Sequence, residues 1–275
     1  MILDTSTAIT GQSAKRWRLS PALRVSLLLH AAVAVLVATH PDAWLWGLAV
    51  LGANHLGLFV AVLSPRGQLL GPNLVRLPAP AVSRREISLT FDDGPDPEVT
   101  PRVLELLDRF QAKASFFCIG EKAAAHPELV KEIARCGHSV ENHSYRHHHA
   151  FAFFGLSRLR REVDTAQTTV ASITGRPPVF FRAPAGFRSP LLDPLLAPRG
   201  LRYVSWTRRG FDAVSGSPKR ILRQLTRGLS AGDILLMHDT APVVLAVLPE
   251  LLEQISAQGL KAVSLASACA DEPVE

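Results

Sequence analysis

The stretch Ile87–Pro95, I-S-L-T-F-D-D-G-P, sets a short apolar run directly before two adjacent carboxylates and a Gly-Pro pair. Residues 87–91 predict a buried strand that Gly-Pro ends. Neighbouring side chains on a strand point to opposite faces, so Asp92 and Asp93 can share one pocket only at the fraying carboxyl end. Burying two carboxylates costs several kcal/mol unless partners stabilise them. An ordinary strand-end turn is the simpler interpretation of this stretch alone, because Asp, Gly and Pro are turn residues.

Composition narrows the class of protein. A chain of 275 residues can hold one large domain, or a domain with an appendage. The net charge is +6, but the basic residues are scattered and no basic run interleaves with aromatics, which disfavours nucleic-acid binding. The three cysteines are odd in number and widely spaced, which argues against a disulfide framework or a thiolate zinc site and leans toward a reducing compartment.

Two apolar segments precede the large domain and account for the mean hydropathy of +0.16. Residues 23–39 are apolar apart from Arg24 and His30, and residues 43–63 apart from Asn54 and His55. Each is close to the roughly 20 apolar residues that a spanning helix needs. We therefore expect two transmembrane helices over residues 23–63, in contact with the lipid bilayer. A cleaved signal peptide and a pair of buried soluble helices are the competing interpretations.

Flanking charge predicts the topology of this hairpin. Basic residues lie before the first segment and after the second, and the connecting turn has none. The positive-inside rule then places both chain ends and the large domain on the cytoplasmic side of the inner membrane, as a multi-pass protein. The residues concerned are Lys15, Arg16, Arg18, Arg24, Arg66, Arg76, Arg84 and Arg85.

The expected domain order has five parts. Residues 1–22 form a polar and basic tail, 23–63 the hairpin, 64–83 a Pro- and Gly-rich linker, 84–268 a catalytic domain and 269–275 a C-terminal tail.

The large domain alternates short apolar runs with helix-period segments, which predicts an α/β fold with a mostly parallel sheet and helices outside. So many units in one domain favour an irregular barrel, with its chemistry at the carboxyl ends of the strands. The expected strands are 87–91, 114–119, 138–140, 179–182, 203–206, 233–237 and 260–263. The expected helices are 99–110, 121–135, 156–173, 218–229 and 242–257.

The run His143–His147, H-S-Y-R-H, contains two imidazoles four residues apart. On one helical turn they would share a face and reach one metal ion. Two histidines and one carboxylate form a familiar metalloenzyme set, and Asp93 offers the carboxylate. A surface His-rich loop is an equal alternative, because His148 and His149 follow directly.

Two further strand ends carry isolated polar residues. Arg182 follows the apolar run 178–181, and if it points inward it must meet an anion, for which Asp92 is the candidate. His238 ends the apolar run Leu235–Met237, where Asp212 or Asp239 would have to orient it. Each signal alone is weak: a surface turn explains the arginine motif better, and a lone histidine at such a position is more often a satisfied core residue than a catalyst.

Together these motifs resemble the polysaccharide deacetylase family, that is, the NodB-homology domain of carbohydrate esterase family 4. The resemblance covers about residues 84–265 and rests on four motifs in the family's order: T-F-D-D-G-P (90–95), H-S-x-x-H (143–147), R-x-P-x-G (182–186) and L-L-M-H (235–238). It implies a distorted (β/α) barrel, a divalent metal that is usually zinc, and removal of N-acetyl groups from amino sugars.

The resemblance also implies residue roles for a reaction in which a metal-activated water attacks the acyl group, with an Asp base and a His acid. Transferred by motif, the metal ligands are Asp93, His143 and His147, the general base is Asp92, the residue that keeps this base ionised is Arg182, the general acid is His238, and the carboxylate that orients it is Asp212.

The chain departs from the family where the substrate would bind. Between R-x-P-x-G and L-L-M-H the family usually has a further motif, the fourth in chain order, that reads Asp-x-x-Asp-Trp. Here Arg209 replaces its first aspartate and Ala213 its tryptophan, and Ala185 stands where an aromatic is common in the third motif. We expect an N-acylated amino sugar of a polysaccharide or a lipid-linked glycan. Alternatives are an N-formyl group on an undecaprenyl-phosphate amino sugar and, in a different class, a non-catalytic glycan-binding membrane protein. A third alternative, a metal sensor or store, leaves Arg182 and His238 unexplained.

Overall fold

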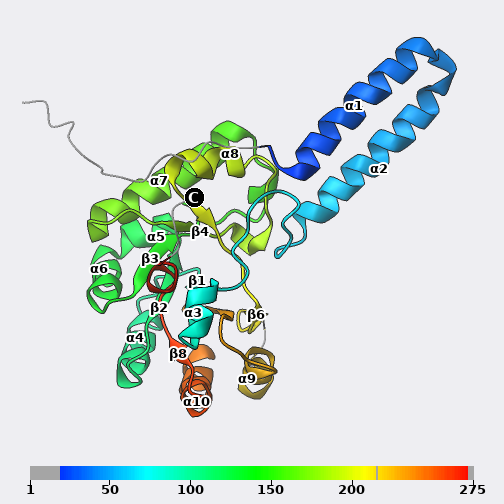
Figure 1. Ribbon diagram of the computed structural model, residues 1–275. Coiled ribbons are helices and arrows are strands. Elements are labelled where there is room, and N and C mark those ends of the chain that lie inside the picture. The colour runs from blue at the N-terminus through cyan, green and yellow to red at the C-terminus, as the bar shows by residue number, and fades with distance from the viewer. Residues whose placement is uncertain (1–18, 215, 272–275) are drawn as a thin grey trace, which may run out of the picture.

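The sheet of the large domain is parallel and curled, and helices cover its outside (Figure 1). The computed structural model describes residues 19–214 and 216–271; Lys15, Arg16, Arg18 and the end of the C-terminal tail lie outside them. The strand order is β5-β4-β3-β2-β1-β7-β6, and β8 pairs with β1. The strands are β1 (Glu86–Asp92), β2 (Ala114–Cys118), β3 (Ser139–Asn142), β4 (Phe180–Phe181), β5 (Arg202–Tyr203), β6 (Arg208–Arg209), β7 (Ile234–His238) and β8 (Lys261–Ala262).

This arrangement confirms the distorted (β/α) barrel, in the form of a curled half-barrel, and its register brings distant residues together. Strand β1 is central, and all seven of its residues are buried. Asp92 is in register with His238 of β7. Asn142 of β3 is in register with Phe181 of β4, so the residues that follow them, His143 and Arg182, emerge side by side. The parallel order therefore gathers the predicted polar residues at one edge of the sheet.

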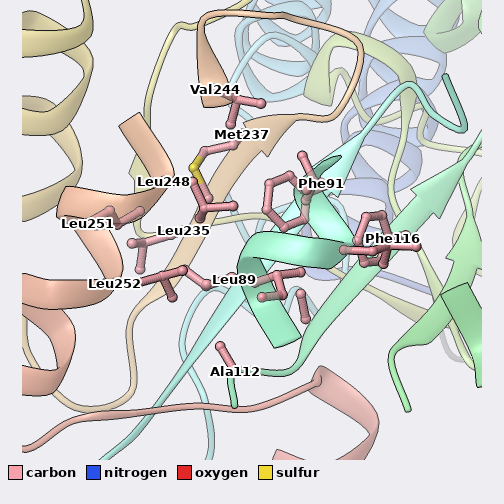
Figure 2. Close-up of a cluster of buried hydrophobic side chains, with 14 of the residues drawn as sticks. Leu89, Phe91, Ala112, Phe116, Leu235, Met237, Val244, Leu248, Leu251 and Leu252 are labelled. Carbon is pink, nitrogen blue, oxygen red and sulfur yellow. The ribbon is translucent and has the colours of Figure 1, made fainter. Parts of the chain in front are cut away.

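The helices bury an apolar stripe against the sheet, and Figure 2 shows part of the resulting core between α10, β7, β1 and β2. Fully burying each large apolar side chain stabilises the fold by about 1.5–3 kcal/mol. The longer helices are α4 (Thr100–Arg109), α5 (Gly120–Ala125), α6 (Pro127–Arg135), α7 (Leu156–Thr174), α9 (Pro218–Thr226) and α10 (Val244–Ala257). The shorter ones are α3 (Ala79–Ser83), α8 (Asp193–Leu196) and α11 (Leu265–Ala268).

The prediction of one continuous helix over residues 121–135 is wrong. The structure divides this segment into α5 and α6 at His126, where Pro127 begins the second helix. Proline lacks the amide proton that an uninterrupted helix would use, but it is well suited to the first helical position.

The two apolar segments form a helical hairpin that projects from the domain (Figure 1). Helix α1 spans Pro21–Thr39 and α2 spans Trp44–Val62, with a short turn (η1, Pro41–Ala43) between them. Both are long and apolar enough to cross a membrane, and only 6% and 17% of their apolar windows are buried. So little burial is unlike the core helices of a soluble domain, whereas a membrane hairpin and a signal sequence both fit.

Residues 64–83, the expected linker, lie against the domain. The backbone of Leu74 forms a parallel bridge with Val204, next to the end of β5. The amide of Leu77 donates to the carbonyl of Gly232, 2.9 Å away, just before β7. The hairpin is therefore joined to the sheet by an ordered segment.

A buried histidine directly before β3 should make the stability of the protein depend on pH. His138 accepts a hydrogen bond from the amide of Ala114 at 3.1 Å, which requires a neutral ring. Burial, helped by the charge of Lys113, lowers the pKa of His138 to about 4. In the unfolded chain the pKa of this histidine is about 6.5. Between pH 6.5 and 4 the unfolded chain therefore binds a proton that the folded chain does not, and about 3 kcal/mol of stability should be lost.

Urea unfolding at pH 7 and pH 4.5 tests this expectation. In His138→Gln, which keeps an acceptor but cannot titrate, the decline in unfolding free energy toward low pH should be smaller than in the natural protein. An identical decline in both proteins would contradict it.

Candidate active site

The Asp-Asp pair turns both of its carboxylates into one pocket. Strand β1 ends at Asp92, and Asp93 adopts a left-handed backbone (φ 71°), which aspartate tolerates better than most residues. Both carboxylates then reach the same imidazole, because His143 Nε2 lies 3.8 Å from Asp92 Oδ2 and 3.3 Å from Asp93 Oδ1. The turn also needs glycine at position 94, since a Cβ there would lie 2.2 Å from a carboxylate oxygen of Asp239.

Asp93 and two histidines form a set that fits a divalent metal. Asp93 Oδ1 lies 3.3 Å from His143 Nε2 and 3.2 Å from His147 Nε2, and the three donor atoms lie within 4.8 Å of one another. Asp93 Oδ1 is buried, yet it has no hydrogen-bond partner among the described residues. His143 Nδ1 donates to the carbonyl of Arg182 at 2.8 Å, which leaves the Nε2 lone pair facing Asp93. Two imidazole nitrogens and one carboxylate suit zinc and similar metals.

The electrostatics of Asp93 and His147 favour the protonation states that a metal needs. Burial alone would raise the pKa of Asp93, but the neighbouring His143, with His147 and His238, lowers it well below its usual value. Burial and the neighbouring His143 lower the pKa of His147 to about 4. Burial opposes a charge on His143 as well, but Asp92 and Asp93 raise its pKa overall. At neutral pH the set therefore offers an ionised carboxylate and a neutral His147, as metal binding requires.

The prediction that His143 and His147 share one helical turn is wrong. The segment is a loop in which Ser144 (φ 62°) and His147 (φ 51°) are left-handed. Side chains accept the amide protons that a helix would bond internally: Ser144 Oγ accepts from His147 N, and Glu162 Oε2 accepts from Tyr145 N and Arg146 N. The ring centroids of the two histidines still lie only 4.8 Å apart.

Glu162 is the positioning residue that sequence reasoning missed. The sequence indicated its role through its position: on α7, Glu162 lies on the same buried face as Leu159, Val163 and Ala166, at helical spacing. A glutamate on the apolar face of a helix needs hydrogen-bond donors, and the histidine loop supplies them.

Arg182 holds Asp92 in a buried ion pair. Its side chain has no exposed surface, which excludes the surface-turn interpretation of its motif. Arg182 Nη1 lies 2.5 Å from Asp92 Oδ1 and also donates to Thr90 Oγ1, and Nη2 donates to the carbonyl of Ser205. The guanidinium stacks 4.1 Å from the centroid of Phe117. These bonds fix the Asp92 carboxylate and compensate its charge.

His238 faces the same pocket from β7. Its Nδ1 lies 3.0 Å from Asp212 Oδ1, and its amide donates to Asp212 Oδ2 at 2.7 Å. Asp239, the other candidate for orienting the ring, instead accepts from Thr100 Oγ1. With Nδ1 engaged, His238 Nε2 points toward the pocket, 3.9 Å from Asp93 Oδ2. Burial lowers the pKa of His238, but the hydrogen bond and charge of Asp212 raise it overall, which suits a proton donor near neutral pH.

The altered fourth motif forms the neighbouring wall. The Arg209 guanidinium lies 5.4 Å from the ring centroid of Trp206 and 5.0 Å from that of Phe211. In the part of the chain that the structure describes, Arg209 makes no ion pair, and its buried Nε has no hydrogen-bond partner. A pocket of about 470 Å³ beside Asp212 is lined by Ala213, where the family usually has tryptophan. The altered motif therefore combines open space beside Ala213 with a guanidinium that has no ion-pair partner among the described residues.

Comparison with known proteins identifies the family of this chain. The polysaccharide deacetylase family matches residues 79–204. A peptidoglycan-N-acetylglucosamine deacetylase of Bacillus cereus is 31% identical over 177 residues, 61% of this chain and 82% of its own. A chitooligosaccharide deacetylase of Azorhizobium caulinodans is 33% identical over 161 residues, 58% of this chain and 76% of its own. The crystal structure of a peptidoglycan N-acetylglucosamine deacetylase in complex with an N-oxidanyl-benzamide has a TM-score of 0.67 and 27% identity, and the match covers 71% of this chain and 92% of the crystallised one.

The curled parallel sheet, the polar residues at its carboxyl edge and the family match together define an enzyme of the deacetylase class on a distorted (β/α) barrel. The chain belongs to the polysaccharide deacetylase family. This confirms the family resemblance and the enzyme class that the four motifs indicate.

Proposed function

We propose that this protein is a metal-dependent hydrolase that removes an N-acyl group, an acetyl group in the first instance, from an amino sugar of a glycan. The observation that carries the proposal is the buried Asp93 Oδ1, which lacks a hydrogen-bond partner among the described residues and faces two imidazole nitrogens beside the paired Asp92. The named activities of the peptidoglycan and chitooligosaccharide deacetylases support N-acetylglucosamine as the sugar.

Each residue of the site then has a task. Asp93, His143 and His147 would hold the divalent metal, which supplies Lewis-acid chemistry for amide hydrolysis when bound. Asp92 takes a proton from the attacking water, while Arg182 keeps its carboxylate oriented.

On the other side of the pocket, His238 Nε2 gives a proton to the departing amine as the carbon–nitrogen bond breaks. Asp212 holds the opposite ring nitrogen and stabilises the charged ring. Every residue to which the family resemblance assigns a role in metal binding or catalysis is present. This supports an enzyme over a non-catalytic glycan-binding protein.

An activity assay with purified full-length protein tests the proposal. Acetylated and formylated amino-sugar oligosaccharides are incubated with and without a chelator, and released acetate and formate are measured. We expect metal-dependent release of acetate, and release of formate alone would identify a deformylase. Absence of any chelator-sensitive release would overturn the enzymatic function.

A second candidate substrate is a lipid-linked amino sugar that carries a phosphate. Two observations favour it: Arg209 has no ion-pair partner among the described residues, and the segment after the apolar hairpin lies nearby, since Arg66 donates to the carbonyl of Thr207 beside β6. A guanidinium is a good partner for phosphate, because its donors match the anion's oxygens. In this form the acyl group is acetyl or formyl.

Arg209→Ala should raise the KM for a phosphate-bearing glycan by about 10- to 100-fold, the equivalent of losing one charged hydrogen bond. KM for a neutral chitooligosaccharide should stay unchanged, and Arg209→Lys should restore part of the effect. The exposed Arg160 on α7 provides the control variant Arg160→Ala. Equal changes in KM for charged and neutral substrates would contradict a role of Arg209 in anion binding.

The membrane part of the proposal concerns the hairpin. We infer that α1 and α2 anchor the protein in the inner membrane, with the large domain on the cytoplasmic side and the domain divisions at 23–63 and 84–268. A reporter fused after Glu275 that is active only outside the inner membrane would overturn this topology.

A further inference from the structure

The base of the hairpin is fixed to the domain by a small apolar core. Ala61 and Val62 at the end of α2 are buried with Leu70 and with Ala152 of η2 (Phe151–Phe153). The amide of Arg188 donates to the carbonyl of Val62 at 3.2 Å. These contacts join the base of the hairpin to the domain, and Figure 1 shows the hairpin projecting from the side of the domain near α8.

A patch of exposed apolar side chains surrounds this junction. Phe153 is 59% exposed, Leu69 is 61% exposed and Leu63 is 38% exposed, and we call these three residues the root patch. Phe153 stacks on Phe59 of α2, with ring centroids 6.1 Å apart. The patch is therefore continuous with the apolar outer surface of the hairpin. Exposed apolar surface of this kind marks an interaction site.

The root patch lies at the edge of the sheet that carries the active site. Phe153 follows the histidine loop that begins at His143. On the other side, the turn after Leu63 approaches the R-x-P-x-G motif, because a Cβ at Gly186 would lie 3.1 Å from Pro65. The root patch therefore adjoins two segments that supply the site, the histidine loop and the R-x-P-x-G motif.

We propose that the occupant of the root patch is the lipid surface itself, so that the domain sits on the bilayer with its active-site edge toward the headgroups. Continuity with the apolar hairpin argues for lipid. The exposed Arg66 lies between Leu63 and Leu69 in the chain, and the exposed Arg24 follows Ala22, whose amide donates to the carbonyl of Leu69; both suit anionic headgroups. The inference rests on the proposed membrane anchoring and deepens the proposed function: the substrate is an amino sugar held at the membrane, within reach of Asp92 and His238.

Lipid quenching of single fluorescent labels tests the proposal in the full-length protein, reconstituted in vesicles of phosphatidylethanolamine and phosphatidylglycerol. Cys136 and Cys269 are replaced by serine, and the buried Cys118 does not react. A bimane label is placed at Phe153→Cys, and quenchers are carried on the lipid headgroups or on the upper acyl chains.

Two further labels complete the design. Leu28→Cys on α1, which is 70% exposed, reports insertion of the hairpin. Arg109→Cys at the carboxyl end of α4, on the opposite edge of the sheet, is the control. We expect lipid quenching at positions 28 and 153 to be several-fold stronger than at 109.

The outcomes separate the two proposals. Quenching at 28 without quenching at 153 overturns the seating of the domain and leaves the anchor intact. No quenching at either position overturns the anchor and the seating together. Protection of the label at 153 that appears only at high protein-to-lipid ratio, without lipid quenching, assigns the patch to a second copy of the chain and overturns a lipid occupant.

Discussion

Replacing Asp92 by asparagine should lower kcat by about 10²- to 10⁴-fold, the usual contribution of a general base. The amide keeps the acceptor oxygen that Arg182 contacts, but it cannot take a proton from water. Metal content should remain that of the natural protein, because Asp93 and the two histidines are untouched. Steady-state kinetics and metal analysis of the same preparation check both halves of this prediction.

Asp92→Asn also removes a buried charge, so stability needs its own measurement. Breaking a buried ion pair from one side costs about 3–5 kcal/mol, and assays must run well below the melting temperature of the variant. Asp239→Asn is a matched control, because Asp239 is an equally buried carboxylate at the neighbouring strand end and bonds Thr100 instead of Arg182. Activity of Asp92→Asn equal to that of this control would remove Asp92 from the mechanism.

Replacing His147 by alanine should remove the metal as well as the activity. The donor set would fall from three groups to two. Loss of outer partners alone weakens metal binding by about 10- to 100-fold, so loss of a direct ligand should exceed that range. Competition with a chromophoric chelator measures the affinity, and the metal retained after dialysis gives the occupancy.

His149→Ala is the control for this second variant. It belongs to the same His-rich run and is exposed, and it lies outside the three-residue set. Its metal content should match that of the natural protein. If His147→Ala kept its metal while His149→Ala lost it, the donor set would be wrongly assigned. These variants also distinguish an enzyme from a metal store. A metal store would lose its metal in His147→Ala, but the natural protein would have no hydrolase activity, so Asp92→Asn could not reduce it.

Much of the fold could be predicted because its signals are local. The strand before Asp92, the helices around the sheet and the two apolar segments each follow from periodicity or from a run of apolar residues. The split at His126 was also readable from Pro127, a local signal that the continuous-helix prediction overlooked.

The geometry of the site depends on contacts between residues far apart in the chain. No local pattern distinguishes Asp212 from Asp239 as the partner of His238; the loop after β6 brings the first to the ring, while Thr100 engages the second. The histidine loop is likewise shaped by its bonds to Glu162. The i, i+4 spacing of its two histidines, taken alone, wrongly indicated a helical turn.

The sequence by itself determined which groups this protein brings to the ends of its strands: two adjacent carboxylates, paired histidines and an arginine after an apolar run, preceded by two apolar segments. The tertiary structure decided how they meet. The left-handed turn at Asp93 and the parallel register of β1 with β7 bring carboxylates, histidines and Arg182 into one pocket. The physical reason is that composition and periodicity act over a few residues, whereas burial and sheet register join side chains that lie some ninety positions apart, as in the bond from Arg182 to Asp92.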